Sequence, residues 1–200
     1  MLNCSHHNSL LLNPKGNPNC CNWYILLAIL LIILFEIFWL TCLIFAQLFG
    51  APTVHASKEA IIDSLKLSNL KKGELVVDLG CGSAKVLIIA AKKFGAKGIG
   101  IDRSPYCYIL SKLNVLLTGQ SKKVKIFHGN FKKYETYLKE ADVVYVYLLE
   151  TVNKKIEKWL FENISPKTRV VSLSFTFANH NVKKTIETRT MWRKTKARLY

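Results

Sequence analysis

The sequence predicts an α/β protein with a doubly wound, mostly parallel seven-stranded sheet of the Rossmann-like type, preceded by one transmembrane helix. Three observations predict this fold. One long apolar segment stands near the N-terminus, from Trp23 to Phe49. Beyond it, short apolar runs alternate with segments of helical periodicity. The runs are continuously apolar, as expected for parallel strands that helices cover on both faces.

The segment from Trp23 to Phe49 is predicted to be a retained membrane anchor. It has 27 residues, and as a helix it would be about 40 Å long, enough to cross a bilayer. A secretory signal would have a shorter apolar core, a basic start and a small-residue cleavage site. The one charge in the segment, Glu36, would either face a partner helix or be tolerated by very apolar surroundings.

The chain is therefore expected to have three parts: a disordered segment 1–22, the transmembrane helix 23–49 and a domain of residues 50–200. Lys15 and Glu36 are the only Lys, Arg, Asp or Glu residues before Lys58, so the whole net charge of +16 lies in the domain. Lysines after the span favour a domain on the cytoplasmic side, or on the equivalent interior side of an organelle. Such a basic surface suits anionic lipid headgroups, acidic proteins or nucleic acid.

Within the domain the expected elements follow one another in βα order. Ser57 is the expected N-cap of a first helix that continues to residue 70, and Pro105 is expected at the first position of a later helix. Strands are expected over 75–79, 98–102, 124–128, 141–149 and 168–177, with a final pair over 182–190 and 196–200. Helices over 83–94, 104–118, 131–138 and 152–161 separate them. The six cysteines form no CxxC pair and no zinc-like cluster, so free thiols and no metal are expected.

The turn 78–84, with the sequence DLGCGSA, bears on the class of ligand. In an open α/β sheet, ligands bind at the carboxyl ends of the strands. A dinucleotide fingerprint would need glycine at position 85, where Lys85 stands, and no phosphate-loop pattern occurs. Instead, Asp78 precedes the glycines and Asp102 ends the second strand, where a carboxylate can accept two ribose hydroxyls. This pattern favours a cationic nucleoside without pyrophosphate, such as S-adenosylmethionine, over a dinucleotide or an empty structural turn.

The pattern resembles the class I S-adenosylmethionine-dependent methyltransferases, with Ala84 where that family usually has a third glycine. The resemblance implies that the glycine turn wraps the methionine part of the cofactor and that Asp102 holds the ribose. It also implies that Asn130, in place of the usual Asp, and Phe131 contact the adenine. The implied cofactor-binding residues are Asp78, Gly80, Cys81, Gly82, Asp102, Arg103, Asn130 and Phe131.

A narrower resemblance is to small membrane-anchored protein lysine methyltransferases, including the mitochondrial enzymes that act on ATP synthase subunit c and the adenine nucleotide translocase. The single span and the segments FGAPTVHAS, LKKGELVVDLGCGSAK, YLLETVN and RVVSLSFTF carry it, although Thr53 and His55 replace the usual Tyr and Pro. It implies a lysine acceptor on a protein in or at a membrane. The acceptor would enter at the end of the fourth strand, where Tyr147 and Glu150 are the candidate catalytic residues.

Each of these assignments has an alternative. Tyr147 could be an ordinary strand residue, like its neighbour Tyr145, and Glu150 could be a solvated acid at the start of a helix. Phe175 and Phe177 could line a channel for an alkyl chain, but the core is the commoner place for phenylalanine. Other functions are methylation of a lipid or small lipophile, or a non-catalytic cofactor-binding interaction module. No nucleic-acid partner is expected, because the N/D-P-P-Y motif is absent, and the sequence predicts no oligomeric state.

Overall fold

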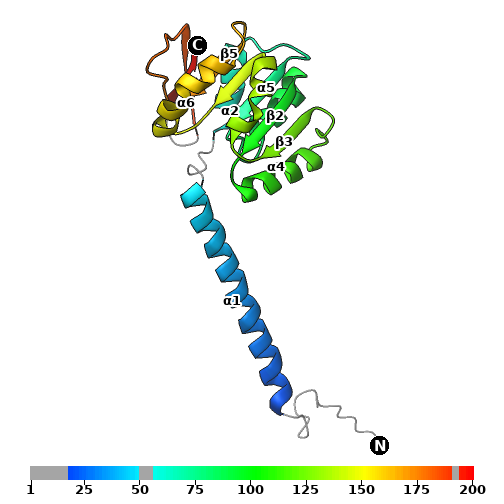
Figure 1. Cartoon of the computed structure of the whole chain (residues 1–200). Helices are drawn as coiled ribbons and strands as arrows, with labels where there is room; N and C mark the ends of the chain where they lie inside the picture. Colours follow the sequence, from blue (N-terminus) through cyan, green and yellow to red (C-terminus); the bar gives the residue numbers. More distant parts are fainter. Residues whose placement is uncertain (1–17, 50–55, 191–193) are drawn as a thin grey trace, which may run out of the picture. The chain divides into compact units, whose positions relative to one another are not determined.

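The computed structural model describes residues 18–49, 56–190 and 194–200, which form two units, Met1–Leu43 and Ile44–Tyr200 (Figure 1). Helix α1, Pro18–Phe49, begins at Pro18 and not at Trp23, where the span was expected to start. Residues 1–17 and their expected disorder lie outside the described residues. Within α1, the window Trp23–Ile44 is long and apolar enough to cross a membrane, with a mean hydropathy of 2.8, and none of it is buried.

The domain is built on a seven-stranded sheet with the order β3-β2-β1-β4-β5-β7-β6. Strands β1 to β5 run parallel, and β7 is antiparallel to both of its neighbours, β5 and β6. The strands are β1 Leu75–Leu79, β2 Lys97–Asp102, β3 Val124–His128, β4 Val143–Val146, β5 Arg169–Leu173, β6 Lys184–Arg189 and β7 Lys194–Leu199. The chain order reverses between β1 and β4, which makes the carboxyl end of β1 the switch point where such sheets bind ligands. The predicted doubly wound, seven-stranded sheet is confirmed.

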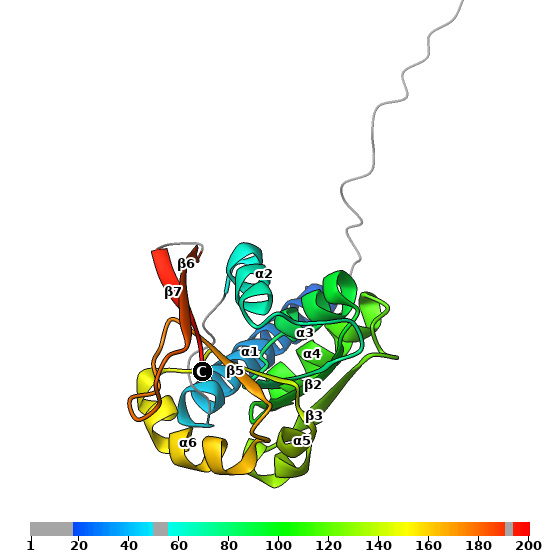
Figure 2. The same cartoon turned by 90° about the horizontal axis from the view of Figure 1, so that it is seen from above.

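Helices cover both faces of the sheet, with α2, α3 and α4 on one side and α5 and α6 on the other (Figure 2). Alternate residues of β1 divide between the two cores, so Val76 packs on the side of α2 and α3, while Val77 packs on the side of α5 and α6. The helices are α2 Lys58–Leu67, α3 Lys85–Ile89, which continues into the π-helical turn η1 Ala90–Phe94, α4 Pro105–Leu117, the 3-10 helix η2 Phe131–Tyr134, α5 Glu135–Glu140 and α6 Glu150–Asn163.

Two helix starts follow the predicted signals, which were a serine cap for one helix and a proline in the first turn for the other. The Ser57 hydroxyl oxygen accepts a hydrogen bond from the Ala60 N–H at 3.0 Å and caps α2. The Ser104 hydroxyl oxygen accepts one from the Cys107 N–H at 3.3 Å, and Pro105 occupies the first turn of α4. Both arrangements satisfy amides that a helix start leaves without intrahelical partners.

The fifth strand is shorter than expected. It ends at Leu173 because Ser174 has a φ of 68°, a left-handed conformation that an extended strand does not contain. The chain then turns, and Phe177 is buried in the core. Its ring packs edge-on against Phe161 and Tyr200, with centroid distances of 5.4 and 5.3 Å. Phe177 is therefore a core residue and not part of a channel.

Candidate active site

The turn after β1 is held by its own backbone hydrogen bonds. The N–H groups of Gly80 and Cys81 both donate to the Ile101 carbonyl oxygen of β2, at 2.9 and 3.2 Å. The Ala84 N–H donates to the Cys81 carbonyl oxygen at 2.8 Å. The Cys81 side chain is buried, and burial raises the pKa of its thiol well above the ordinary value. Cys81 can therefore shape the turn through its backbone, while its thiol stays protonated in the core.

Asp102 ends β2 and fixes the tip of the turn. Its Oδ2 accepts a hydrogen bond from the Gly82 N–H and its Oδ1 one from the Ser104 N–H, both at 2.9 Å. A carboxylate oxygen has more than one acceptor site, so both oxygens can still accept a ligand hydroxyl. Phosphate-binding turns leave amides free for the anion. Here four amides of the turn already have protein partners, so the turn is not built for pyrophosphate.

The two glycines of the turn have different roles. Gly80 has a φ of +77°, which strains any residue with a side chain, and a Cβ there would lie 2.7 Å from Cδ2 of Leu148, so the leucine side chain would have to shift. Gly82 has a φ of +52°, but a Cβ there would meet nothing within 4 Å. The space beside Gly82 is open, and this is the side on which a ligand can approach the backbone.

Ala84 takes the conformation that a third glycine would take. Its φ is +60° and its side chain is fully buried. A left-handed conformation costs a non-glycine residue roughly 1–2 kcal/mol. The turn thus keeps its shape with alanine, at the expense of local strain immediately before α3.

Asp78 and Tyr145 form a buried pair beneath the turn. They are register partners on β1 and β4, and only 3% of Asp78 is exposed. Burial, together with the negative charge of Asp102, raises the pKa of the Asp78 carboxyl from 3.8 to about 8. Burial and the neighbouring Asp78 also raise the pKa of Tyr145. The Tyr145 hydroxyl has no hydrogen bond of standard geometry among the described residues, and Ser64 beside it donates its own hydrogen to the Ala60 carbonyl oxygen.

The residues implied in adenine binding follow β3. Asn130 caps η2, since its Oδ1 accepts a hydrogen bond from the Lys132 N–H at 3.1 Å. The Phe131 ring packs against Trp159 of α6, with a centroid distance of 5.4 Å. Arg103 directly follows Asp102 and its side chain is exposed. All three lie at the carboxyl edge of β2 and β3, while their roles in cofactor binding stay predictions.

The two candidate catalytic residues lie beyond the end of β4. Tyr147 is half-buried, and its ring centroid lies 6.3 Å from that of Phe175, which follows β5. Glu150 is the first residue of α6 and its side chain is 56% exposed. Its carboxylate forms an ion pair with Lys154 at 3.0 Å, one helical turn away. Both residues therefore stand at the strand end where a substrate would enter, and their catalytic roles stay predictions.

The arrangement selects the ligand by its charge. Asp102 ends β2, and the amides of Gly80, Cys81, Gly82 and Ala84 are occupied, so a diphosphate would meet a carboxylate where a phosphate-binding turn offers free amides. A ligand with a cationic amino group and a ribose would find an acceptor for each, at Asp78 and Asp102. S-adenosylmethionine has these groups, and the residues present fit it.

Comparison with known proteins agrees with this conclusion. A family model described as the ANTKMT methyltransferase domain matches residues 78–184. The chain belongs to this family. A protein-lysine N-methyltransferase of Saccharolobus islandicus (strain REY15A) is 31% identical over 137 residues, which cover 68% of this chain and 84% of the relative. An RNA methyltransferase from Salinibacter ruber, solved in complex with S-adenosyl-L-homocysteine, is 30% identical with a TM-score of 0.66, over 72% of this chain and 92% of that one.

A further relative shares a shorter region. The ribosomal protein L11 methyltransferase of Actinobacillus succinogenes is 33% identical over 107 residues, which are 53% of this chain but 34% of that enzyme. The predicted resemblance to class I methyltransferases is confirmed, and the protein is an S-adenosylmethionine-dependent methyltransferase. The dinucleotide alternative is thereby set aside.

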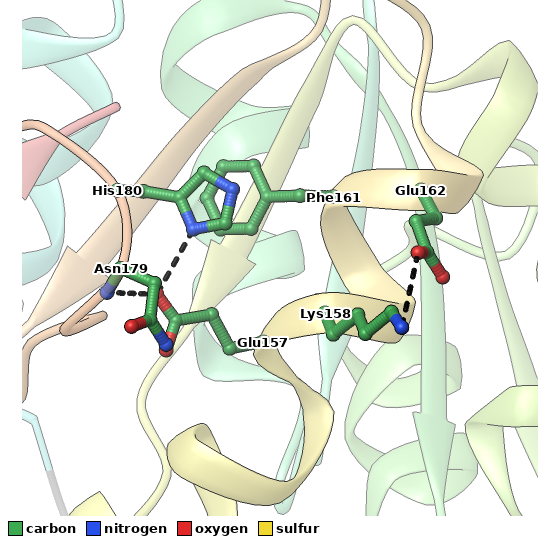
Figure 3. Close-up of a pocket in the computed structure, with 6 residues that line it drawn as sticks. All are labelled: Glu157, Lys158, Phe161, Glu162, Asn179 and His180. Atoms are coloured by element: carbon green, nitrogen blue, oxygen red, sulfur yellow. Dashed lines mark hydrogen bonds and ion pairs between the residues drawn. The ribbon is translucent and has the colours of Figure 1, made fainter.

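Sequence reasoning missed a second polar cluster, which Figure 3 shows between α6 and the connection from β5 to β6. Glu157 of α6 is 2% exposed, and its carboxylate accepts hydrogen bonds from the N–H groups of Ala178 and Asn179, from Asn179 Nδ2 and from His180 Nδ1. Burial acts to raise the pKa of Glu157, but these hydrogen bonds outweigh it and hold the pKa below its ordinary value. His180 also stacks on Phe161, with a centroid distance of 3.5 Å. The cluster fixes a crossover connection in which no helix is formed.

Proposed function

We propose that this methyltransferase is anchored in a membrane and transfers methyl groups to lysine side chains of membrane or membrane-associated proteins. The observation that carries the lysine assignment is the family match together with the relative whose name is protein-lysine N-methyltransferase. Its aligned region of 137 residues covers 68% of this chain and 84% of the relative, so the likeness is not confined to the cofactor turn.

The apolar helix supports the membrane location. The 22 residues Trp23–Ile44 form an apolar helix whose one charge is Glu36, and none of this helix is buried in the described structure. Leaving such a surface in water is unfavourable, and a bilayer would cover it. The linker from Phe49 to Ala56 could extend at most about 25 Å. An anchored domain would therefore stay close to the bilayer, and its effective concentration toward membrane substrates would be high.

The cofactor supplies an electrophilic methyl group bound to a sulfonium. In this proposal Asp102 holds the ribose hydroxyls, Asp78 accepts the amino group, and the open side of Gly82 admits the methionine part. The protein has little covalent chemistry to perform, because in-line displacement depends mainly on proximity and orientation. Its role is to hold the acceptor nitrogen in line with the bond between the sulfonium and the methyl group, and to leave a path by which this nitrogen loses its proton.

Tyr147 and Glu150 are the proposed acceptor-side residues. Glu150 already holds an ammonium group, that of Lys154, at 3.0 Å, so its position suits a cation. A substrate lysine can exchange with Lys154 at this exposed carboxylate. Tyr147, packed against Phe175, offers an aromatic wall for the alkyl part of the incoming side chain and a hydroxyl for its nitrogen.

Isotope transfer tests this proposal. The full chain in native-like membranes, supplied with methyl-labelled S-adenosylmethionine, should place the label in acid-stable N-methyl-lysine of membrane proteins. The Asp102→Ala variant should give no label, and removal of residues 1–49 should lower labelling of membrane substrates while cofactor binding remains. Label that a nuclease releases, or that partitions into the lipid extract, would contradict the lysine assignment in favour of RNA or lipid. Undiminished labelling without residues 1–49 would contradict the role of the anchor.

A further inference from the structure

Helix α4 places five of its larger apolar side chains toward solvent, while Tyr108 and Leu110 are half-buried. The exposed ones are Tyr106 (54%), Ile109 (65%), Leu113 (48%), Leu116 (66%) and Leu117 (74%). The buried face of the same helix consists of the smaller residues Cys107, Ser111 and Val115. An ordinary surface helix has the reverse arrangement, with its larger apolar residues on the core side.

The exposed apolar residues of α4 form one stripe. At 100° per residue, the five positions fall within roughly 100° of the helix circumference, directly opposite the buried face. Apart from α1, the one other large apolar side chain that is exposed in the described part of the chain is Val182. Figure 1 shows α4 at the edge of the domain beside β3. The stripe is therefore a concentrated surface feature and not a scatter of single exposed residues.

The surroundings of the stripe are basic. No Asp or Glu occurs in the sequence between Asp102 and Glu135, whereas seven basic residues do: Arg103, Lys112, Lys122, Lys123, Lys125, Lys132 and Lys133. All seven are exposed, and none forms an ion pair with any described residue. Arg103 precedes α4, Lys112 lies on it, and Lys122 and Lys123 follow it, so positive charge is present along the whole helix.

We propose that α4 is a second membrane contact, which lies in the interface of a bilayer that contains anionic lipid. The stripe inserts at the boundary between headgroups and acyl chains, and the basic residues contact the headgroups. A second copy of the chain suits this surface poorly, because a two-fold contact would bring the same lysines together. Single-stranded RNA suits it poorly as well, because four of the five residues of the stripe are leucine or isoleucine, which offer bases no stacking surface.

This contact would fix the orientation of the active site. Helix α4 begins three residues after Asp102, whose carboxylate accepts the Ser104 N–H at the helix start. Interfacial docking of α4 therefore places the ribose end of the cofactor site next to the bilayer surface. The inference rests on the proposed membrane location, because α1 would bring the domain to the membrane and α4 would determine which face of the domain lies against the bilayer.

Site-specific photo-crosslinking tests the inference on the full chain. A benzophenone amino acid replaces Leu113 in the stripe, Leu31 in α1, or Lys158, an exposed residue of α6 whose side chain is 89% exposed. Each variant is reconstituted into vesicles of phosphatidylcholine with 30% phosphatidylglycerol and irradiated, and adducts are identified by mass spectrometry. Binding of S-adenosylmethionine by each variant verifies that it is folded.

The probe at Leu113 should give a yield of lipid adducts at least fivefold above that of the probe at Lys158. The yield at Leu113 should fall at least threefold in vesicles of pure phosphatidylcholine, and also when Lys112, Lys122 and Lys123 are changed to Glu. Lipid adducts at Leu31 without any at Leu113 would overturn the α4 inference alone. Absence of lipid adducts at both positions would overturn the membrane location as well. A crosslink from Leu113 to a second copy or to another protein would assign the stripe to a protein interface and would also overturn the inference.

Discussion

Replacement of Asp78 by Asn tests the buried carboxyl beneath the glycine turn. The pKa of Asp78 is raised from 3.8 to about 8 by burial and by the charge of Asp102. Between these two values the folded protein holds a proton that the unfolded chain releases, so stability falls as the pH rises through this window. At 1.36 kcal/mol per pH unit, this carboxyl lowers the free energy of unfolding by at most about 4 kcal/mol between pH 4 and pH 7.

Urea unfolding of the full chain in detergent micelles, followed by circular dichroism from pH 4.5 to 8, measures this effect. Asparagine has nearly the same shape and cannot ionise, so Asp78→Asn should gain stability relative to wild type as the pH rises. Glu162→Gln, which changes an exposed acid with 61% of its side chain accessible, should follow the wild-type profile. Parallel profiles for wild type and Asp78→Asn would contradict the raised pKa, because Asp78 would then be ionised in the folded protein.

The affinity for S-adenosylmethionine should also depend on the ionisation of Asp78. A cationic amino group requires the carboxylate form of Asp78, so the affinity of the wild type for S-adenosylmethionine should rise from pH 6 to 7.5, by up to about tenfold per pH unit. The Asp78→Asn variant should bind more weakly, and its affinity should not vary with pH in this range. A constant wild-type affinity across this range, measured by calorimetry, would mean that the amino group binds elsewhere.

Three further substitutions test other parts of the structure. Ala84→Gly should raise the free energy of unfolding by about 1 kcal/mol in urea titrations, because glycine adopts the left-handed conformation without strain; an unchanged or lower stability would contradict that strain. Glu157→Gln should lower the free energy of unfolding by about 1–3 kcal/mol at pH 7 and by less near pH 4, because a carboxyl with a lowered pKa stabilises only when ionised. Equal losses at both pH values would contradict this expectation. Glu150→Ala should lower the turnover of a lysine substrate at least tenfold without changing cofactor affinity. The control Glu162→Ala, at the other end of α6, should change neither quantity. Equal turnover of the two variants would show that Glu150 is not part of the acceptor site.

The sheet and the cofactor turn could be predicted because their signals are local. β1 and β3 have the bounds that their apolar runs indicated, and Ser57 and Ser104 cap the helices that follow them. The acids at the ends of β1 and β2 could be recognised because the carboxyl ends of parallel strands share one edge of the sheet.

Other features depend on tertiary packing that the sequence does not display. The cluster around Glu157 joins residues 21 to 23 positions apart and has no motif. The choice between Tyr145 and Tyr147 could not be made from alternation, and the structure places Tyr145 beside Asp78. The face of α4 that the sheet covers depends on how the helix is rotated, so periodicity alone could not show that its leucines are exposed.

Calorimetry of the full chain with S-adenosylmethionine and, separately, with NAD shows directly which ligand the turn after β1 binds. We expect one S-adenosylmethionine per chain, no binding of NAD, and loss of S-adenosylmethionine binding in Asp102→Ala, because Asp102 holds the Gly82 amide and is the proposed acceptor of the ribose hydroxyls. Binding of NAD by the wild type, or undiminished S-adenosylmethionine binding by Asp102→Ala, would contradict the site described above.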